Sequence, residues 1–303
     1  MARVVAETLK NTIPYSANAW ETITLPKAPA ITHIDLLLEL TVKTGTATPS
    51  PAAHAPISLI KNVNVIQGGE YPIQGTGWIL FVKGYYESKG KVRKDSLTTS
   101  TSTTQTVYAE ILIHPGLNPE DKGDVSVAIP TDVVEETKLA VLWGDESDLG
   151  SGYTIDSAEI IVTVWKVLDR KPLALPAWNY DTKSIDATYS DLAFTLQPPV
   201  GKFYSKAVIE VLDSNGSDSD DVVSELGVVD KRRATEILHR ISWLIEQRDD
   251  ARRYNVDPLT GHVIFDAKEL GTPVVLGVKD VVLGFTTTAT GKINALFNSF
   301  VRR

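Results

Sequence analysis

A faint internal repeat constrains the fold of this chain more than any local motif does. Residues 24–40 and residues 195–211 match without a gap, and each stretch reads as a short strand, a turn and a longer apolar strand. Self-similarity of this kind is a fold-level signal, because each copy corresponds to one structural unit. The repeat therefore predicts two similar β-modules in tandem. The identical pairs are Thr24 and Thr195, Leu25 and Leu196, and Glu39 and Glu210.

The composition fits a globular chain that builds two cores. The chain has 303 residues, which is long for one compact core, so two domains are expected. Apolar residues make up 43% and charged residues 22% of the chain, which are ordinary proportions for a globular protein. No stretch approaches the roughly 18 apolar residues that span a bilayer, and residues 1–7 lack the apolar run of a signal peptide. We therefore expect a soluble chain without an obvious export signal.

Charge and cysteine content exclude several classes of function. The formal net charge of -8 argues against a protein whose whole surface binds nucleic acid, because phosphate binding needs clustered Lys and Arg. We therefore expect no sequence-specific nucleic-acid partner. The chain has no cysteine, which excludes disulfides, thiolate metal ligands and a cysteine nucleophile.

Short β-rich runs separated by clusters of Gly, Pro, Asn, Ser and Thr dominate both halves of the chain, a pattern typical of a sandwich or barrel. In the first half the sequence predicts strands at residues 21–25, 34–43, 57–67, 77–86, 106–114, 124–129, 138–143 and 157–168. In the second half it predicts strands at residues 192–196, 207–212, 261–265, 273–276, 280–286 and 293–301.

The predicted domain boundary lies in the segment from Asp169 to Pro176. This segment contains two prolines and a charged cluster, which cannot continue a central strand. We therefore assign residues 1–171 to the first module and residues 172–303 to the second.

One helix is predicted, at about residues 230–253 in the second module. The run that follows Asp230, a plausible N-cap, contains neither Gly nor Pro. Its apolar residues recur at the 3, 4, 7 spacing of one helix face, so we expect the helix to pack against the flank of a sheet. The residues of this apolar face are Ala234, Ile237, Leu238, Ile241, Leu244 and Ile245.

Residues in each of the two modules carry a family resemblance. Residues 57–69 and 78–80 read as a strand, a Gly turn and an amphipathic segment, and residues 261–266 and 276–285 read as closing strands. With its tandem β-modules and inserted helix, the chain resembles the double jelly-roll major capsid proteins of tailless icosahedral viruses, the adenovirus- and tectivirus-like lineage. The chain lacks the long tower insertions of the larger relatives, which leaves the lineage open, the neighbouring single-jelly-roll viruses included.

The resemblance implies an all-β fold of two tandem eight-stranded jelly rolls, which are β-sandwiches. It also implies homotrimers of pseudo-hexagonal outline that tile an icosahedral shell with neighbouring capsid trimers and minor capsid or vertex proteins, around a membrane or a genome. The implied location is the virion shell, assembled in the host cytoplasm, with no enzymatic activity. A physical argument points the same way, because a closed ring of like subunits covers the open edges and flat walls of a jelly roll.

No catalytic or cofactor-binding residue is predicted. The chain shows no nucleophile elbow and no carboxylate pair in a telling context. The five histidines show no metal-ligand spacing, so no histidine metal site is predicted. They are His33, His54, His114, His239 and His262.

The acidic loop at residues 213–221 is the only metal candidate, because several carboxylates in one loop could hold Ca²⁺. Ser224 stands where an EF-hand needs Glu, so the loop is not an EF-hand, and the alternative is a solvated surface loop. The candidate ligands are Asp213, Asp218, Asp220 and Asp221.

Two further patterns keep other functions open. The chain could be a carbohydrate-binding or adhesion β-sandwich protein in which exposed Trp78, Trp143 and Trp178 form a sugar-stacking platform. Residues 85–94 interleave aromatic residues with four cations, which could stack on nucleic acid or form a charged loop at a subunit contact.

Overall fold

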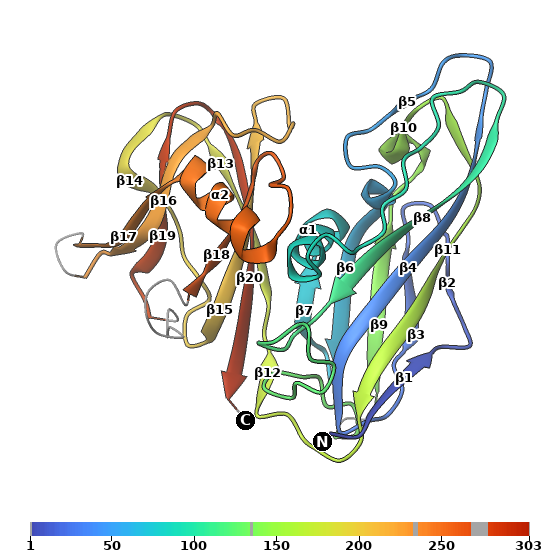
Figure 1. Cartoon of the computed structure of the whole chain (residues 1–303), viewed down its shortest axis with the longest axis horizontal. Helices are drawn as coiled ribbons and strands as arrows, with labels where there is room; N and C mark the ends of the chain where they lie inside the picture. Colours follow the sequence, from blue (N-terminus) through green and yellow to red (C-terminus); the bar gives the residue numbers. More distant parts are fainter. Residues whose placement is uncertain (1, 134–135, 233–235, 268–277, 303) are drawn as a thin grey trace. The chain divides into compact units, whose positions relative to one another are not determined.

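The computed structural model describes residues 2–133, 136–232, 236–267 and 278–302 (Figure 1). The chain divides into two compact units, Met1–Pro176 and Ala177–Val301. The division lies at 176/177, at the end of the proline-containing segment and five residues after the predicted boundary at 171/172. In the described residues no helix has both the length and the apolar character needed to cross a bilayer.

Two antiparallel sheets form the first unit. The β4 sheet has the strand order β1–β11–β4–β8, with β2 also paired to β11, and the β6 sheet has the order β3–β9–β6–β7. The short strands β5 (Ser50–Pro51) and β10 (Gly150–Ser151) pair with each other, and β12 is Ala174–Pro176. The main strands are β1 (Val4–Thr8), β2 (Ile13–Pro14), β3 (Trp20–Thr24), β4 (Ala30–Thr44), β6 (Ile60–Gln67), β7 (Glu70–Gly75), β8 (Thr104–Ile113), β9 (Thr137–Trp143) and β11 (Tyr153–Val167).

The second unit repeats this arrangement. The β15 sheet has the order β13–β20–β15–β18, and the β16 sheet has the order β14–β19–β16–β17. Its strands are β13 (Asn179–Ile185), β14 (Tyr189–Leu196), β15 (Phe203–Asp213), β16 (Val223–Asp230), β17 (Glu236–Ser242), β18 (His262–Asp266), β19 (Val281–Thr287) and β20 (Gly291–Arg302).

Both units share one topology. Each unit has eight principal strands, which can be counted in chain order. Strands one, three, six and eight form the β4 sheet or the β15 sheet, and strands two, four, five and seven form the β6 sheet or the β16 sheet. This alternation between two packed sheets is the jelly roll. The predicted all-β fold of two tandem eight-stranded jelly rolls is confirmed.

The internal repeat of the sequence falls on equivalent strands. Thr24 and Thr195 lie at the ends of β3 and β14, which occupy the same place in the two jelly rolls, and the Leu that follows each is 2% exposed. Glu39 and Glu210 lie on β4 and β15, each of which pairs with the equivalent two neighbours. The repeat therefore marks topologically equivalent positions.

The core of each unit lies between its two sheets. In β4, the side chains of Leu36, Leu38 and Leu40 are no more than 1% exposed, while the residues between them are only partly buried. This two-residue period is that of a strand with one face on the core. In β15 the corresponding residues 207, 209 and 211 join the core cluster of the second unit.

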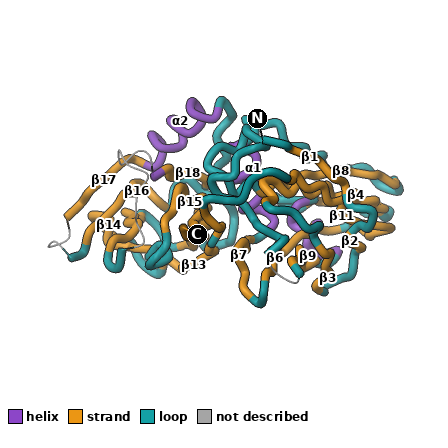
Figure 2. The backbone as a smooth tube through the Cα atoms, turned by 90° about the horizontal axis from the view of Figure 1, so that it is seen from below, coloured by secondary structure: helices purple, strands orange, loops and turns teal. Residues whose placement is uncertain are grey.

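Among the described residues each unit has one α-helix, inserted in the same connection. Helix α1 (Gly77–Glu87) follows β7 and precedes β8, and α2 (Trp243–Tyr254) follows β17 and precedes β18. The hydroxyl of Thr76 caps α1 by accepting a hydrogen bond from the backbone of Ile79 at 3.3 Å. Figure 2 shows the two helices, in purple, among strands that make up most of both units.

The prediction of one helix at about 230–253 is wrong in its first half. Asp230 is the last residue of β16 and not an N-cap, and residues 236–242 form β17, which pairs with β16. The helix begins only at Trp243, with Ser242 as N-cap. The apolar residues of β17 happen to lie at helical spacing from the apolar residues of α2. Together they therefore imitate the periodicity of one long helix. Ala234 lies outside the described residues.

The predicted apolar face is also not the buried face of α2. Leu244 is 63% and Ile245 42% exposed, and Ile237 and Leu238 of β17 are 41% and 47% exposed. The helix instead buries a largely polar face, so its attachment depends on hydrogen bonds. The buried residues are Trp243, Glu246, Gln247, Asp250 and Tyr254.

Three other sequence predictions need comment. The strand predicted at 77–86 is wrong, because these residues form α1; a short, buried, aromatic-rich run does not distinguish helix from strand. Residues 124–129 form only isolated bridges, at Val127 and Ile129. The strand predicted at 273–276 lies outside the described residues. The strands that the sequence does not predict are β1, β2, β5, β7, β10, β12, β13, β16 and β17.

We expect the substitution Gly77→Ala to destabilise the protein although Ala favours helices. The added Cβ would lie 2.3 Å from the carbonyl oxygen of Ile60 and 2.9 Å from its Cβ, so the backbone must shift. Overpacking of this kind costs about 1–3 kcal/mol, more than the gain of at most about 1 kcal/mol in helix propensity. A lower midpoint in thermal unfolding is the expected measurement. Gly45→Ala is the control, because nothing lies within 4 Å of its added Cβ; equal midpoints for both variants would contradict the argument.

Candidate functional site

In the first unit, buried charged groups hold α1. The side chains of Lys83 and Glu87 on α1 are 0% and 1% exposed, and the Lys83 ammonium donates to the Glu87 carboxylate at 2.5 Å. It also donates to the backbone carbonyl of His114, the residue after β8, at 3.0 Å. Removing one partner of a buried pair leaves an uncompensated charge, which is strongly destabilising. This pair therefore fixes α1 to the end of β8.

Two histidines and an aspartate lie beside the pair of Lys83 and Glu87 and connect it to β4. We call these five residues the α1 polar cluster. The ring centroids of His33 and His114 are 4.2 Å apart, and His114 Nε2 lies 3.7 Å from Asp35 Oδ1. The second carboxylate oxygen of Asp35 accepts a hydrogen bond from the indole of Trp165 at 2.8 Å. His33 Nε2 donates to the carbonyl of Pro119 at 3.0 Å.

The environment keeps both imidazoles neutral at neutral pH. Burial, reinforced by the nearby His114 and Lys122, lowers the pKa of His33 to about 3. Burial also lowers the pKa of His114, against the opposing effect of Asp35 and Glu87. Burial alone would raise the pKa of Asp35, but the nearby His114 ring, the charge of Lys122 and the hydrogen bond from Trp165 lower it.

The α1 polar cluster does not have the geometry of a catalytic site. In the described part of the chain, no hydroxyl forms a hydrogen bond with the ring of His33 or His114, so neither imidazole has a nucleophile to activate. The Lys83 ammonium is already bonded to a carboxylate and a carbonyl. The cluster is built to hold a helix on a sheet.

We expect stability to fall as the pH is lowered from 7, partly through His33. Its pKa is about 3 in the folded chain and about 6.5 in an unfolded one, so the unfolded state binds more protons between these values. Stability from this group is complete above pH 6.5 and is lost progressively below it, by roughly 1 kcal/mol at pH 5.5. Thermal unfolding at pH 7.5 and 5.5 measures the loss.

His33→Gln is the matched variant for this test, because its amide can donate to the Pro119 carbonyl but does not titrate. We expect a smaller drop in its unfolding midpoint between the two pH values. An unchanged drop would show that His33 does not cause the acid sensitivity.

In the second unit, a carboxylate from the predicted acidic loop holds α2. Asp220 Oδ1 accepts hydrogen bonds from the indole of Trp243 at 3.1 Å, the amide of Gln247 at 2.6 Å and the backbone N–H of Gly261 at 2.7 Å. Asp250 Oδ2, also on α2, accepts from the backbone of Ile264 in β18 at 2.6 Å. Helix α2 is therefore attached through side-chain acceptors.

The four candidate Ca²⁺ ligands are not brought together. Asp213 accepts hydrogen bonds from the backbone of Asn215 and Ser217 within its own loop, and Asp220 is used by α2. Among the described residues, no three of the four carboxylates offer ligand atoms within 4.8 Å of one another. Two of the four candidate ligands therefore have other roles, Asp213 within its loop and Asp220 on the helix.

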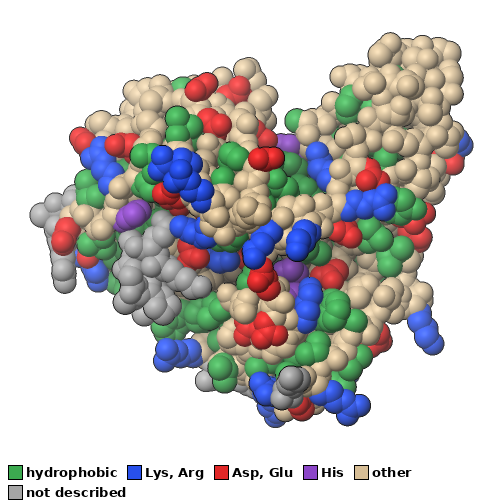
Figure 3. Space-filling model, in the orientation of Figure 1, with side chains coloured by type: hydrophobic (Ala, Val, Ile, Leu, Met, Phe, Trp, Pro, Cys, Tyr) green, Lys and Arg blue, Asp and Glu red, His purple; other side chains and the backbone are tan. Residues whose placement is uncertain are grey.

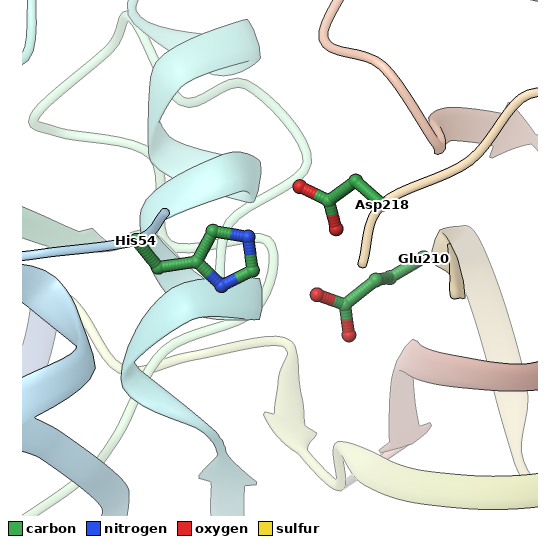
Figure 4. Close-up of side chains that lie close together, drawn as sticks. All are labelled: His54, Glu210 and Asp218. Carbon is green, nitrogen blue, oxygen red and sulfur yellow. The ribbon is translucent and has the colours of Figure 1, made fainter. Parts of the chain in front are cut away.

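Asp218 instead lies near Glu210 of β15, and Figure 4 shows the two side chains close together. Their ligand atoms are within 4.8 Å of each other. His262 Nε2 lies 3.6 Å from Glu210 Oε1, and Asn294 donates to the other Glu210 oxygen at 2.5 Å. His54, also labelled in Figure 4, belongs to the first unit and is not counted in this cluster.

His262 lies beside this pair of carboxylates, which favour its protonated form. Burial alone would lower the pKa of His262, but Glu210, Asp218 and the Thr260 carbonyl outweigh burial and raise it. The residues are distant in sequence and show no motif spacing, so no sequence pattern could indicate the cluster. Its partners for the buried Glu210 carboxylate come from the chain itself, namely His262 and Asn294.

We expect Asp220→Ala to destabilise the second unit by about 2–3 kcal/mol, because it leaves the fully buried indole of Trp243 without its acceptor. Urea unfolding followed by tryptophan fluorescence measures the change. Asp221→Ala is the control, since that side chain is exposed. An equal and small effect of both substitutions would contradict the structural role of Asp220.

The sugar-stacking platform is wrong. Trp143 is 0% and Trp178 1% exposed, so both are core residues and neither can meet a ligand. Trp78 is half-buried and stacks on His54 and Phe81 of its own unit. The sequence cannot distinguish a core tryptophan from a surface one where apolar and polar residues do not alternate regularly along a strand.

The cationic segment at 85–94 is largely neutralised within its own unit. Lys89 pairs with Glu120 at 2.6 Å, and Arg93 pairs with Asp95 at 2.7 Å. Lys94 lies over the ring of Trp78. These contacts favour a charged surface loop over a nucleic-acid stacking platform.

Comparisons with known proteins identify the fold. No protein-family model and no curated protein sequence matches the chain. The crystal structure of the STIV MCP matches over 99% of this chain and 97% of its own, with 19% identity and a TM-score of 0.85. A chain from the atomic structure of Sulfolobus Turreted Icosahedral Virus matches over 99% and 91%, with 18% identity and a TM-score of 0.83. The major capsid protein P2 of bacteriophage PM2 matches over 99% and 97%, with 15% identity and a TM-score of 0.61.

At these identities the likeness establishes the fold. The matched chains are double jelly-roll capsid proteins of tailless icosahedral viruses, which is the fold that the sequence resemblance implied. The chain has the double jelly-roll fold over its two units.

Proposed function

We propose that this chain is the major capsid protein of a tailless icosahedral virus, a structural subunit whose function is to assemble a shell. The observation that carries the proposal is the match to the STIV MCP over 99% of this chain and 97% of the other. The match therefore extends over both units of this chain.

The chemistry of the buried polar groups supports a non-enzymatic role. The charged and hydrogen-bonding side chains under α1 and α2 are bonded to one another and to the backbone. They hold the two inserted helices in place. We infer that the chain acts through its surfaces, without a cofactor.

The edges of the sheets support assembly. In the described residues, β3 and β7 end the β6 sheet, and β14 and β17 end the β16 sheet, so each pairs on one side only. Open edges attract other strands unless they are covered or blunted. Contacts with like subunits in a shell provide such cover.

The finer assignments follow from the proposal. We propose that the chain forms homotrimers of pseudo-hexagonal outline, which tile the shell with neighbouring trimers and with minor capsid or vertex proteins. The shell lies around a membrane or a genome and belongs to the virion, after assembly in the host cytoplasm. We propose no sequence-specific contact with nucleic acid.

Light scattering coupled to size-exclusion chromatography tests the proposal. We expect a mass of about 99 kDa, three times the 33.1 kDa of one chain, or larger shells. Electron microscopy of that fraction is expected to show hexagonal outlines. A monomer at every concentration and salt condition would argue against a capsid subunit.

A further inference from the structure

The exposed face of α2 is an apolar and cationic stripe. Leu244, Ile245, Arg248 and Arg252, which we call the α2 stripe, follow one another at the spacing of one helix face. The two aliphatic residues are 63% and 42% exposed, and the two arginine side chains are 55% and 69% exposed. Ile237 and Leu238 of β17, the strand that precedes α2 in the chain, are also exposed.

This concentration of exposed apolar residues is unusual within the molecule. Twelve large hydrophobic side chains are exposed in the described residues, and four of them fall within residues 237–245. An exposed apolar patch with a polar rim marks an interaction site more often than a scattered single residue does. The polar anchoring of α2 explains how these residues remain outside without weakening the helix.

The α2 stripe carries a net positive charge. Arg248 Nε and Arg252 Nη1 lie 3.4 Å and 3.7 Å from the same oxygen, Oδ1 of Asp249. Two guanidinium groups therefore share one carboxylate. Figure 3 shows Lys and Arg side chains gathered over the part of the second unit where Figure 1 draws α2. A partner for this stripe is expected to be apolar and acidic.

A surface hollow of the first unit has this character. Its lining is acidic and partly apolar, and its volume is about 510 Å³. None of the described residues that line it is Lys or Arg. We call it the acidic hollow; its residues are Tyr15, Ala17, Asp145, Glu146 and Ser147.

An exposed aromatic residue lies close to the acidic hollow along the chain. Asn18 donates to the carboxylate of Asp145 at 2.9 Å, and its backbone N–H bonds to the carbonyl of Gly144. Trp20, two residues further on, is 46% exposed. Burial raises the pKa of Tyr15, and the charges of Glu146, Asp145 and Asp148 raise it further, which reflects the negative field there.

We propose that the α2 stripe of one copy of this chain docks into the acidic hollow of a second copy. The arginines face the carboxylates of the hollow, and the aliphatic residues lie against its apolar wall and Trp20. Because stripe and hollow are different surfaces, the contact is heterologous, and such contacts close into rings when the rotation permits. The inference rests on the proposed shell function and names the subunit contact that would serve it.

Charge reversal tests the pairing. We expect Arg248→Glu and Glu146→Arg each to raise the dissociation constant of the assembly by about tenfold or more, because close charge pairs across an interface are strongly coupled. The double variant is expected to return to within about threefold of the unmodified chain, since the charges are exchanged. Sedimentation and light scattering give the constants, and Arg170→Glu, an exposed cation elsewhere, is the control.

The apolar part of the stripe has its own test, which does not depend on Glu146 tolerating substitution. Leu244→Ser is expected to weaken assembly by about tenfold, because it removes an exposed aliphatic side chain from a buried contact. Leu173→Ser is the matched control, since Leu173 is 72% exposed and lies outside the stripe. Circular dichroism and the unfolding midpoint confirm that each variant is folded.

The outcomes separate this inference from the proposed function. If the unmodified chain assembles and the stripe variants assemble equally well, the docking contact is wrong and the shell function stands. Failure of the double variant to restore assembly also overturns the pairing. If the unmodified chain stays monomeric, the proposed function and the inference both fail, and that result appears before any variant is made.

Discussion

The structure depends on the burial of two inner sheet faces against each other, once in each unit. Strand residues alternate between faces, so every strand that contributes Leu, Ile or Val to the core presents its other face outward. In β4 this alternation keeps Leu36, Leu38 and Leu40 out of contact with solvent. Only the outer faces and the edge strands are left to contact the helices or other chains.

The helices occupy this remaining space and are attached in an uncommon way. An amphipathic helix on a sheet normally buries an apolar stripe. Helix α2 instead buries Gln247 and Asp250 and bonds through them to Asp220, His262 and Ile264. The apolar residues of the same helix are thereby left on the outside. Helix α1 differs, because it adds the buried pair of Lys83 and Glu87 to a buried face that is mostly apolar.

Much of the architecture could be predicted from the sequence because it depends on local periodicity. The matched positions of the internal repeat, such as Leu25 and Leu196, fall on equivalent buried positions of the two jelly rolls. The helix was misplaced because β17 and α2 are adjacent and both carry apolar residues, whose combined spacing imitates one long helix. Periodicity detects apolar residues but cannot show whether a face is buried.

The polar clusters could not be predicted for a different reason. Asp220 and Gly261 are 41 residues apart, and Lys83 and His114 are 31 residues apart, so their contacts exist only after the sheets have formed. No short-range spacing encodes such a contact. The sequence shows acidic residues in one loop, which are candidate ligands or a solvated surface, whereas the fold directs the carboxylates of Asp213 and Asp220 to different partners.

Both helices are inserted between the edge strand of one sheet and the edge strand of the other, β7 to β8 and β17 to β18. At this connection the chain leaves one sheet and enters the other. A segment inserted here therefore does not interrupt the hydrogen bonds between strands of either sheet. The length and surface of the connection can therefore change while both sandwiches keep their strand registers. A lineage built on this fold has, in each half, one position at which new outer surface can evolve independently of the core.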